Sequence, residues 1–327
     1  MIALALATQD DDAGIRRLLA STPMPGRIRV RFEREPSYFA GCAPDTQVLV
    51  ARDGGRVVGV ACRTIRKLYV DGVAEDVGYL GQLRVDPAYR GQLLTARGYR
   101  VMRELHGDGR ARGYYTTIVD GNAQAEGVLV RRSRGVMPRY RFVEKLYTLA
   151  IRSAGRRPAG PPAAGRSRRA AGGPAAGPAA LPNLFPAYEP QGELVTVPGG
   201  SAAIVDQRAY KQTVIDGYDR AMSFARPFYN LVGRIRLPRP NTALNHAYVT
   251  HFRAEDPYAL IRAVLERGRR YDHLLFGFTE SDPHLHAARA FRPVEYTSSI
   301  YTVAFDDGDD FHDRLLARPR ALDLSAI

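Results

Sequence analysis

The sequence predicts an α/β fold in which a mixed, mostly antiparallel sheet is flanked by helices, and it predicts two such domains in tandem. Residues 153–180 contain only Ser, Ala, Gly, Arg and Pro, and they divide the chain into two parts of comparable size. Alternating strand and helix patterns fill the first part, and a weaker version of the same order recurs in the second. Such alternation is typical of a sheet covered by helices.

Length and composition narrow the class of protein. A chain of 327 residues, 45% of them hydrophobic, is long enough for two domains of about 150 residues, each with its own core. No stretch approaches the roughly 18 consecutive apolar residues of a membrane span, and no basic leader opens the chain. We therefore expect a soluble, cytoplasmic protein. Cys42 and Cys62 have neither metal-ligand nor disulfide-scaffold spacing, and we expect no metal.

The net charge of +13 raises the question of nucleic-acid binding. Among the 47 basic residues only Lys67, Lys145 and Lys211 are lysines, so the excess is arginine, as a GC-rich coding bias would give. The arginines of residues 153–180 also lack the interleaved aromatic residues of a single-strand binder. Nucleic acid is therefore not an expected partner.

The arginine-containing segment is predicted to be a flexible linker. Residues 153–180 cannot bury enough apolar surface to offset the entropy lost on ordering. The expected organisation is a first domain at residues 1–152, a linker at 153–186, a second domain at 187–310 and a C-terminal tail at 311–327.

The first domain begins with a strand pattern at residues 2–7 and a helix pattern at residues 10–20. An irregular arm with Pro and Gly follows. The tripeptide Asp53-Gly54-Gly55 is a hairpin signal, and it joins the strands predicted at residues 47–51 and 56–65.

A strand, a turn and a helix come next. After the turn at Asp71-Gly72, the apolar run of residues 77–85 predicts a strand. Arg90-Gly91 forms a turn, and residues 93–105 carry apolar side chains at helical spacing. The domain is completed by a strand at residues 114–119, a short helix at 122–130 and a strand at 141–151.

The stretch Leu-Arg-Val-Asp-Pro-Ala-Tyr-Arg-Gly-Gln, residues 83–92, resembles the acyl-CoA-binding motif of the GNAT (Gcn5-related) N-acetyltransferase superfamily. It ends a strand and opens a helix, whose N-terminus suits a pyrophosphate. Leu93 and Thr95 depart from the family pattern, which has small residues there. The order of elements over residues 1–152 also resembles the GNAT sheet. The resemblance implies acetyl-CoA as cosubstrate, held by Leu83, Arg84, Val85, Arg90, Gly91, Gln92, Leu93, Leu94, Thr95 and Asn122.

A second motif supports the same resemblance. The stretch Asp-Gly-Asn-Ala-Gln-Ala, residues 120–125, is similar to a later family motif in which the Asn hydrogen-bonds the pantetheine arm. Asn122 is also well suited to cap a helix N-terminus. Both roles stay open at this point.

The resemblance also implies a chemistry. In the family, two neighbouring strands splay apart at a bulge, pantetheine lies in the gap, and a backbone N–H polarises the thioester carbonyl. Here the two strands would be residues 77–85 and 114–119, with the polarising amide at residues 83–85. The acetyl group would pass directly to the amine in a ternary complex, without a covalent enzyme intermediate.

The acid and the base depart from the family pattern. The position of the family's mid-strand glutamate falls at Tyr79. Glu75 and Asp76 at the beginning of the strand are alternative bases that would act through water. The position of the usual tyrosine acid falls at Leu129, so Tyr140 is the first candidate to replace it and Tyr114 is another. The candidate catalytic residues are therefore Tyr140, Tyr79 and Glu75, and each of them also suits a packing role.

The second domain repeats the order strand, helix, strand, helix, strand. Its elements are expected at residues 245–252, 257–267, 273–279, 282–291 and 296–305. At the turn that matches the phosphate loop it carries Glu255 and Asp256, whose carboxylates would repel a pyrophosphate. We interpret it as a degenerate, non-catalytic GNAT-like domain that completes a substrate groove or a dimer surface.

Two functions follow from the sequence. The first is acetyl transfer from acetyl-CoA to an unidentified primary amine on a small molecule or a peptide. The second is a non-catalytic acyl-CoA-binding regulatory protein, which the missing acid and base favour. A homodimer is compatible with both. His273, His284 and His286 do not predict a metal site, because helix positions two apart face different directions and no acidic cluster accompanies them.

Overall fold

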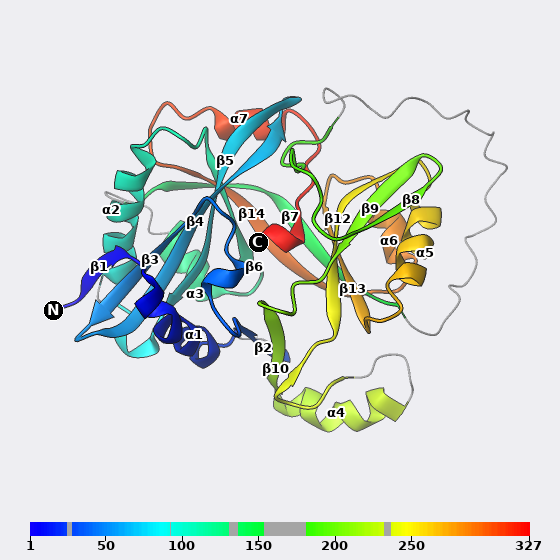
Figure 1. Ribbon diagram of the computed structural model, residues 1–327, viewed down its shortest axis with the longest axis horizontal. Helices are drawn as coiled ribbons and strands as arrows, with labels where there is room; N and C mark the ends of the chain where they lie inside the picture. The colour runs from blue at the N-terminus through cyan, green and yellow to red at the C-terminus, as the bar shows by residue number, and fades with distance from the viewer. Residues whose placement is uncertain (25–27, 92, 131–136, 154–180, 232–236) are drawn as a thin grey trace.

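The computed structural model describes residues 1–24, 28–91, 93–130, 137–153, 181–231 and 237–327. Residues 154–180, most of the predicted linker, lie outside the described residues. The described residues form one 11-stranded sheet, one three-stranded sheet and the helices that flank them (Figure 1). The predicted mixed, mostly antiparallel sheet flanked by helices is confirmed.

The first half of the chain contains the predicted elements. They are, in order, β1 (Ala3–Leu6), α1 (Asp12–Ser21), β2 (Ile28–Glu33), β3 (Thr46–Asp53), β4 (Arg56–Val70), β5 (Val73–Val85), α2 (Leu94–His106), β6 (Tyr114–Val119), α3 (Ala123–Ala125) and β7 (Arg139–Arg152). Two details differ from expectation. Strand β2 was not predicted, and the short helix after Asn122 is a three-residue helix followed by a π-helical turn, Glu126–Val130.

The second half shows the predicted order only in its later part. Its elements are β8 (Glu193–Val197), β9 (Gly200–Val205), β10 (Gln212–Tyr218), α4 (Arg220–Leu231), β11 (Thr242–Ala243), β12 (His246–Ala254), α5 (Pro257–Arg267), β13 (His273–Thr279), α6 (Leu285–Arg289), β14 (Val294–Ala304) and α7 (Phe311–Leu316). The order strand, helix, strand, helix, strand from β12 to β14 is as expected, whereas the elements from β8 to α4 were not predicted.

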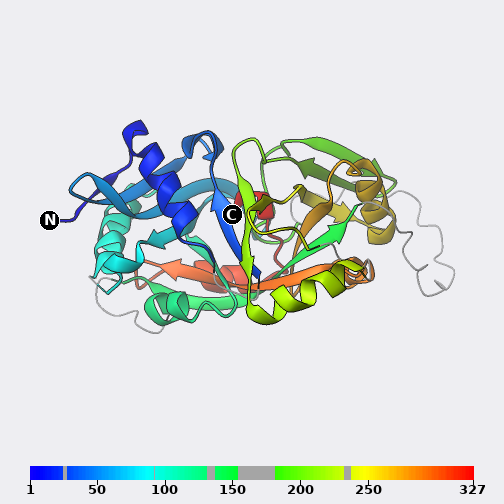
Figure 2. The same ribbon diagram turned by 90° about the horizontal axis from the view of Figure 1, so that it is seen from below.

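The two halves exchange strands in the large sheet. Its order is β1-β3-β4-β5-β6-β14-β7-β13-β12-β9-β8, so the last strand of the chain lies between two strands of the first half. Strand β14 pairs antiparallel with β6 on one side and with β7 on the other. Strand β7 in turn pairs with β13 of the second half. Figure 2 shows the resulting sheet running through both halves. Each half is therefore completed by the final strand of the other.

Helices cover both faces of the first half. Side chains of β3 alternate between the faces, as in any strand. Leu49 packs with Tyr99 and Met102 of α2, whereas Val48 packs on the opposite face with Ile15 of α1. In the second half, Leu260, Ile261 and Val264 of α5 pack against buried residues of β12 and β13. The sheet with its helical layers positions the loops at its strand ends.

An arm connects the halves on one side of the large sheet. Strand β2 of the first half pairs antiparallel with β10 of the second, and β11 extends this three-stranded sheet. No helix among the described residues is both long and apolar enough to cross a membrane.

The segment predicted as a C-terminal tail packs into the core. Phe311, Leu315 and Leu324 are buried in a cluster that also contains Tyr79 and Tyr115. Figure 1 shows this end of the chain between the two halves. These residues therefore stabilise the contact between β5, β6 and the second half.

An ion pair between Glu144 and Arg320 stabilises the contact between the two halves. Glu144 of β7 is only 4% exposed, and its carboxylate accepts a hydrogen bond from Arg320 Nε at 2.5 Å. The same carboxylate accepts a second bond from the N–H of Ser281 at 2.9 Å. Glu144 thus joins a strand of the first half to two segments of the second.

Replacing Glu144 with Ala is expected to lower the free energy of unfolding by about 3 kcal/mol, because the Arg320 side chain, only 11% exposed, loses its carboxylate partner. Chemical denaturation followed by circular dichroism measures the change. Glu193→Ala is the control, since Glu193 pairs with the exposed Arg267 and Arg270 and such surface pairs contribute about 1 kcal/mol or less. Equal losses in the two variants would show that the Glu144 pair has no special role.

Candidate functional site

Strands β5 and β6 diverge soon after they meet. Their parallel pairing comprises Gly78 with Tyr114 and Tyr79 with Tyr115. Beyond these pairs β5 runs on to Val85, still paired with β4 on its other side. Thr116 Oγ1 of β6 donates a hydrogen bond to the carbonyl of Leu80 at 2.6 Å at the start of the gap. The strands therefore splay, as the sequence predicted.

A bulge in β5 accompanies the divergence. Gln82 has a φ of +55°, and the register between β4 and β5 shifts between Val60 and Cys62. The extra residue turns the strand, which is the usual effect of a bulge. The side-chain oxygen of Gln82 accepts a hydrogen bond from the Tyr38 hydroxyl at 2.9 Å, so the bulge is held from outside the sheet. Residues 83–85 lie on the far side of the bulge.

The loop after β5 leads to an open helix N-terminus. Gly91 is exposed with a φ of +88°, and no atom lies within 4 Å of where a side-chain carbon would be added. Gln92 lies outside the described residues. Leu93 is the N-cap of α2 and makes no side-chain capping bond, while Leu94 is buried against Ala51 and Val58. Among the residues that the structure describes, no side chain caps the first N–H groups of α2, and such an end attracts anions.

Leu93 occupies a backbone conformation that suits glycine. Its φ is +53°, and its side chain is largely exposed. The left-handed region costs a residue other than glycine roughly 1 kcal/mol. The sequence departs here from the glycine of the family motif, but the backbone keeps the conformation that a glycine would adopt.

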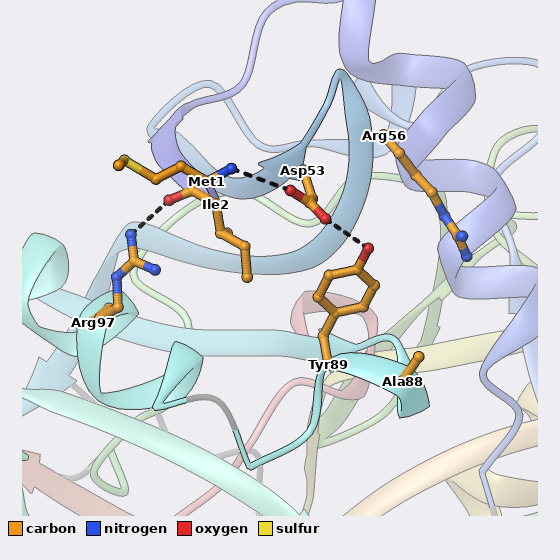
Figure 3. Close-up of a pocket in the computed structure, with 7 residues that line it drawn as sticks. All are labelled: Met1, Ile2, Asp53, Arg56, Ala88, Tyr89 and Arg97. Carbon is orange, nitrogen blue, oxygen red and sulfur yellow. Dashed lines mark hydrogen bonds and ion pairs between the residues drawn. The ribbon is translucent and has the colours of Figure 1, made fainter.

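A hollow of about 680 Å³ borders this loop (Figure 3). Ala88 and Tyr89, which precede the loop, form one wall, and the Tyr89 hydroxyl donates a hydrogen bond to Asp53 at 2.9 Å. Arg97 of α2 donates to the carbonyl of Ile2 at 2.6 Å on the other side. The hollow is lined by Met1, Ile2, Asp53, Arg56, Ala88, Tyr89 and Arg97.

The region that contains this loop matches a known protein family. Residues 15–133 match the model of the acetyltransferase (GNAT) family. They form a GNAT domain. No curated protein matches the chain.

Several solved structures are similar to the chain at low sequence identity. A tandem GNAT protein from the clavulanic acid biosynthesis pathway is 14% identical, with 94% of this chain and all of that chain covered and a TM-score of 0.48. A GCN5-related N-acetyltransferase from Kribbella flavida is 12% identical, with 92% and 70% covered and a TM-score of 0.42. A conserved protein of Enterococcus faecalis described as a probable N-acyltransferase is 8% identical, with 91% and 72% covered and a TM-score of 0.42.

Tyr79 lies at the mouth of the gap in the GNAT domain. It is the last residue of β5 paired with β6, and its hydroxyl is 3.3 Å from Thr117 Oγ1 on the diverging strand. Burial raises the pKa of the Tyr79 hydroxyl to about 12. The hydroxyl is therefore protonated near neutral pH and available as a hydrogen-bond donor.

Tyr140 and Glu75 already have partners. The Tyr140 hydroxyl hydrogen-bonds the Tyr99 hydroxyl of α2 inside the core, where burial raises the Tyr140 pKa well above its usual value. Tyr140 is the second residue of β7 rather than part of the loop before it. Glu75, the third residue of β5, pairs with Arg314 at 2.6 Å. The sequence could not show these partners, because Arg314 is distant in the chain.

Asn122 caps the short helix α3. Its side-chain oxygen accepts a hydrogen bond from the N–H of Ala125 at 3.1 Å. The capping role that the sequence left open is therefore present. The predicted contact with pantetheine remains a prediction.

The second half has a corresponding gap between the parallel strands β12 and β13, and the side chain of His284 lies across it. Strands β12 and β13 are parallel up to Val249 and Phe276, and His251 on the next length of β12 has a φ of +54°. His284 lies across this gap: Nδ1 contacts Asp282 at 2.8 Å and Nε2 contacts the carbonyl of Ala254 at 3.1 Å. His284 is thus committed to hydrogen bonds with oxygen atoms. Among the described residues, no group of three or more His, Cys, Asp or Glu is placed to hold a metal ion.

The helix that follows this second gap is capped. Asp256 accepts a hydrogen bond from the N–H of Ala259 at 3.0 Å, at the first turn of α5. A carboxylate therefore stands where an anion would bind, in contrast to α2. The sequence expectation that Glu255 and Asp256 disfavour a pyrophosphate agrees with this geometry.

Proposed function

We propose that the chain is an acetyl-CoA-dependent N-acetyltransferase whose first half carries the reaction. The observation that supports this most is the divergence of β5 and β6 at the Gln82 bulge, directly before the uncapped N-terminus of α2. A gap between strands suits an extended pantetheine arm, and an open helix end suits its pyrophosphate. The filled gap and capped helix of the second half favour one cofactor per chain.

The proposed roles of the residues follow the chain. Main-chain amides at Leu83, Arg84 and Val85 polarise the thioester carbonyl. The segment from Arg90 through Gly91, Gln92, Leu93 and Leu94 to Thr95 receives the pyrophosphate. Asn122 contacts the pantetheine arm. We also propose domain boundaries at residues 152 and 187 and a cytoplasmic location.

The reaction is a direct transfer. The neutral amine nitrogen attacks the thioester carbon, the C–N bond forms and the C–S bond breaks. The amine loses one proton to a base, for which Glu75 acting through water is the candidate, and the thiolate gains one proton to leave as CoA. Tyr79 and Tyr140 are the candidate donors to the sulfur. The acceptor is a primary amine on a small molecule or a peptide.

Titration calorimetry and a turnover assay test this proposal together. Acetyl-CoA is expected to bind once per chain, and free thiol is expected to accumulate when a panel of primary amines is added. Absence of acetyl-CoA binding would refute the proposal.

The second candidate function is a non-catalytic acyl-CoA-binding regulatory protein. It is favoured by the engagement of Tyr140 with Tyr99 and of Glu75 with Arg314, which leaves neither group poised for proton transfer. Binding of acetyl-CoA without turnover on any amine would decide for this candidate.

Replacing Gly91 with Val is expected to weaken acetyl-CoA binding at least tenfold, or about 1.4 kcal/mol, because a branched side chain would obstruct approach to the open end of α2. Calorimetry measures the affinity. Gly109→Val is the matched control, since Gly109 has a φ of +66° and no atom within 4 Å, so it carries the same backbone strain away from the site. If both variants lost affinity equally, strain would explain the result and the loop assignment would fall.

A further inference from the structure

Four cationic side chains gather where the two halves meet. They are called the cationic cluster here: Arg34, Arg66, Arg84 and Lys211. Arg66 and Arg84 belong to β4 and β5, Arg34 follows β2, and Lys211 directly precedes β10 of the second half. Arg34 and Lys211 are each only 7% exposed. The two halves therefore bury positive charge between them.

Two of these side chains meet at the last residues of the sequence. Lys211 Nζ donates to a carboxylate oxygen of Ile327 at 2.6 Å, and Arg66 Nη1 donates to the carbonyl of Ala326 at 2.6 Å. The Arg34 guanidinium lies over the Tyr38 ring at 5.8 Å. The Tyr38 hydroxyl bonds Gln82, two residues before Arg84.

Among the described residues, two carboxylates offset part of the charge of this cluster. One is the carboxylate of Ile327, which contacts Lys211, and the other is Asp323, which also accepts hydrogen bonds from Tyr188 and Ser325. Arg84 donates to the carbonyl of Leu83, which is neutral. Burial and the charges of Arg34 and Arg66 lower the pKa of Lys211 to about 7. Four cations face two carboxylates here, and buried charge in excess opposes folding, so the cluster is kept at a cost in stability.

One buried donor of the cluster has no partner. Arg34 Nε is buried and makes no hydrogen bond with the described residues. Native proteins leave few such atoms unsatisfied, and those that remain call for an explanation. A ligand oxygen would satisfy this donor.

The cluster also borders the proposed transfer site. Arg84 lies on the length of β5 beyond the Gln82 bulge, next to the gap between β5 and β6. The charges of Arg66 and Arg84 act on the Tyr79 hydroxyl at the mouth of that gap. If the acceptor amine entered the gap from this side, the rest of the acceptor molecule would lie beside the cationic cluster.

We propose that the acceptor is an amine that also carries an oxyanion, a carboxylate or a phosphate, and that the cationic cluster binds this group. The inference rests on the proposed function and adds the substrate class. The oxygens of Ile327 and Ala326 already accept hydrogen bonds from Lys211 and Arg66, whereas Arg34 Nε is a donor that no described residue satisfies. Arginine suits such a role, because its guanidinium matches the geometry of carboxylates and phosphates.

Pairs of amines that differ only in charge test the proposal. O-phosphoethanolamine is compared with ethanolamine, and β-alanine with β-alaninamide, both by calorimetry on the acetyl-CoA complex and by thiol release. The anionic member of at least one pair is expected to bind at least tenfold more tightly, and the pair that does so distinguishes phosphate from carboxylate. If acetyl-CoA binds but neither anionic amine is preferred, the cluster proposal is overturned while the proposed function stands. If acetyl-CoA itself does not bind and the anionic amines bind no better to the free protein, both proposals fail.

Variants of the cluster give a second readout. Arg34→Gln and Lys211→Met are expected to reduce the preference for the anionic amine at least tenfold and to leave acetyl-CoA affinity unchanged. Arg29→Gln is the control, because Arg29 is exposed on β2 and pairs with Asp216. The melting temperature of Lys211→Met is measured as well, since this variant also removes the hydrogen bond to the Ile327 carboxylate. A lower melting temperature with an unchanged amine preference would show that Lys211 serves the fold alone.

Discussion

Cutting the chain within residues 160–170 is expected to leave the two halves bound to each other as a single particle. Strand β14 of the second half is paired on both edges with strands of the first, and β7 of the first half is paired with β13 of the second. Separation would break four strand ladders, the pairing of β2 with β10 included, and expose the contact between Glu144 and Arg320. A cleavage site for a specific protease, placed in this segment, makes the cut. Gel filtration of the cut protein should match the intact protein, while a denaturing gel shows two fragments.

The same geometry predicts the behaviour of an isolated first half. Residues 1–153 expressed alone would leave the edges of β6 and β7 without β14, and unpaired edges promote aggregation. The uncut protein carrying the cleavage site is the control for the insertion. Elution of the cut protein as two smaller, folded species would contradict the strand exchange.

Tyr79→Phe is expected to lower kcat about 100-fold, the range for losing one proton-transfer group, with acetyl-CoA affinity close to wild type. Its hydroxyl lies at the point where β5 and β6 part, 3.3 Å from Thr117 Oγ1. Burial keeps the hydroxyl protonated, so it can donate to the departing sulfur. Thiol release under saturating acetyl-CoA, with an amine that the wild type acetylates, measures the effect.

Tyr140→Phe is the matched comparison. It removes an equally buried hydroxyl, but one that is bonded to Tyr99 in the core of the first half. We expect it to change melting temperature more than kcat. The opposite result, with normal turnover in Tyr79→Phe and a large loss in Tyr140→Phe, would transfer the donor role to Tyr140.

Much of the first half could be predicted because its signals are local. The turns at Asp53 and Asp71 and the apolar run of β5 define neighbouring strands, and a hairpin pairs what is close in sequence. The loop at Gly91 carried a motif, and the positive φ of Gly91 agrees with the reason for a glycine there. The beginning of α5 at Pro257 was predicted from the sequence, and the structure adds that Asp256 caps it.

The rest depended on contacts that no local pattern encodes. Strand β2 alternates in sequence, but its partner β10 lies in the other half of the chain. Glu75 looked available until Arg314 was placed beside it. The cationic cluster combines Arg34 with Lys211. These two residues come close only when β2 pairs with β10. The sequence reports residue types, whereas the availability of a group depends on its neighbours in space.

The position of β14 also constrains how this chain is made. A ribosome releases the first half long before residues 294–304 exist, so β6 waits for a partner about 180 residues downstream. Contacts so far apart raise the contact order, which slows folding. The first half therefore acquires its complete sheet only after residues 294–304 have been made, and until then its open strand edges are what chaperones would need to shield.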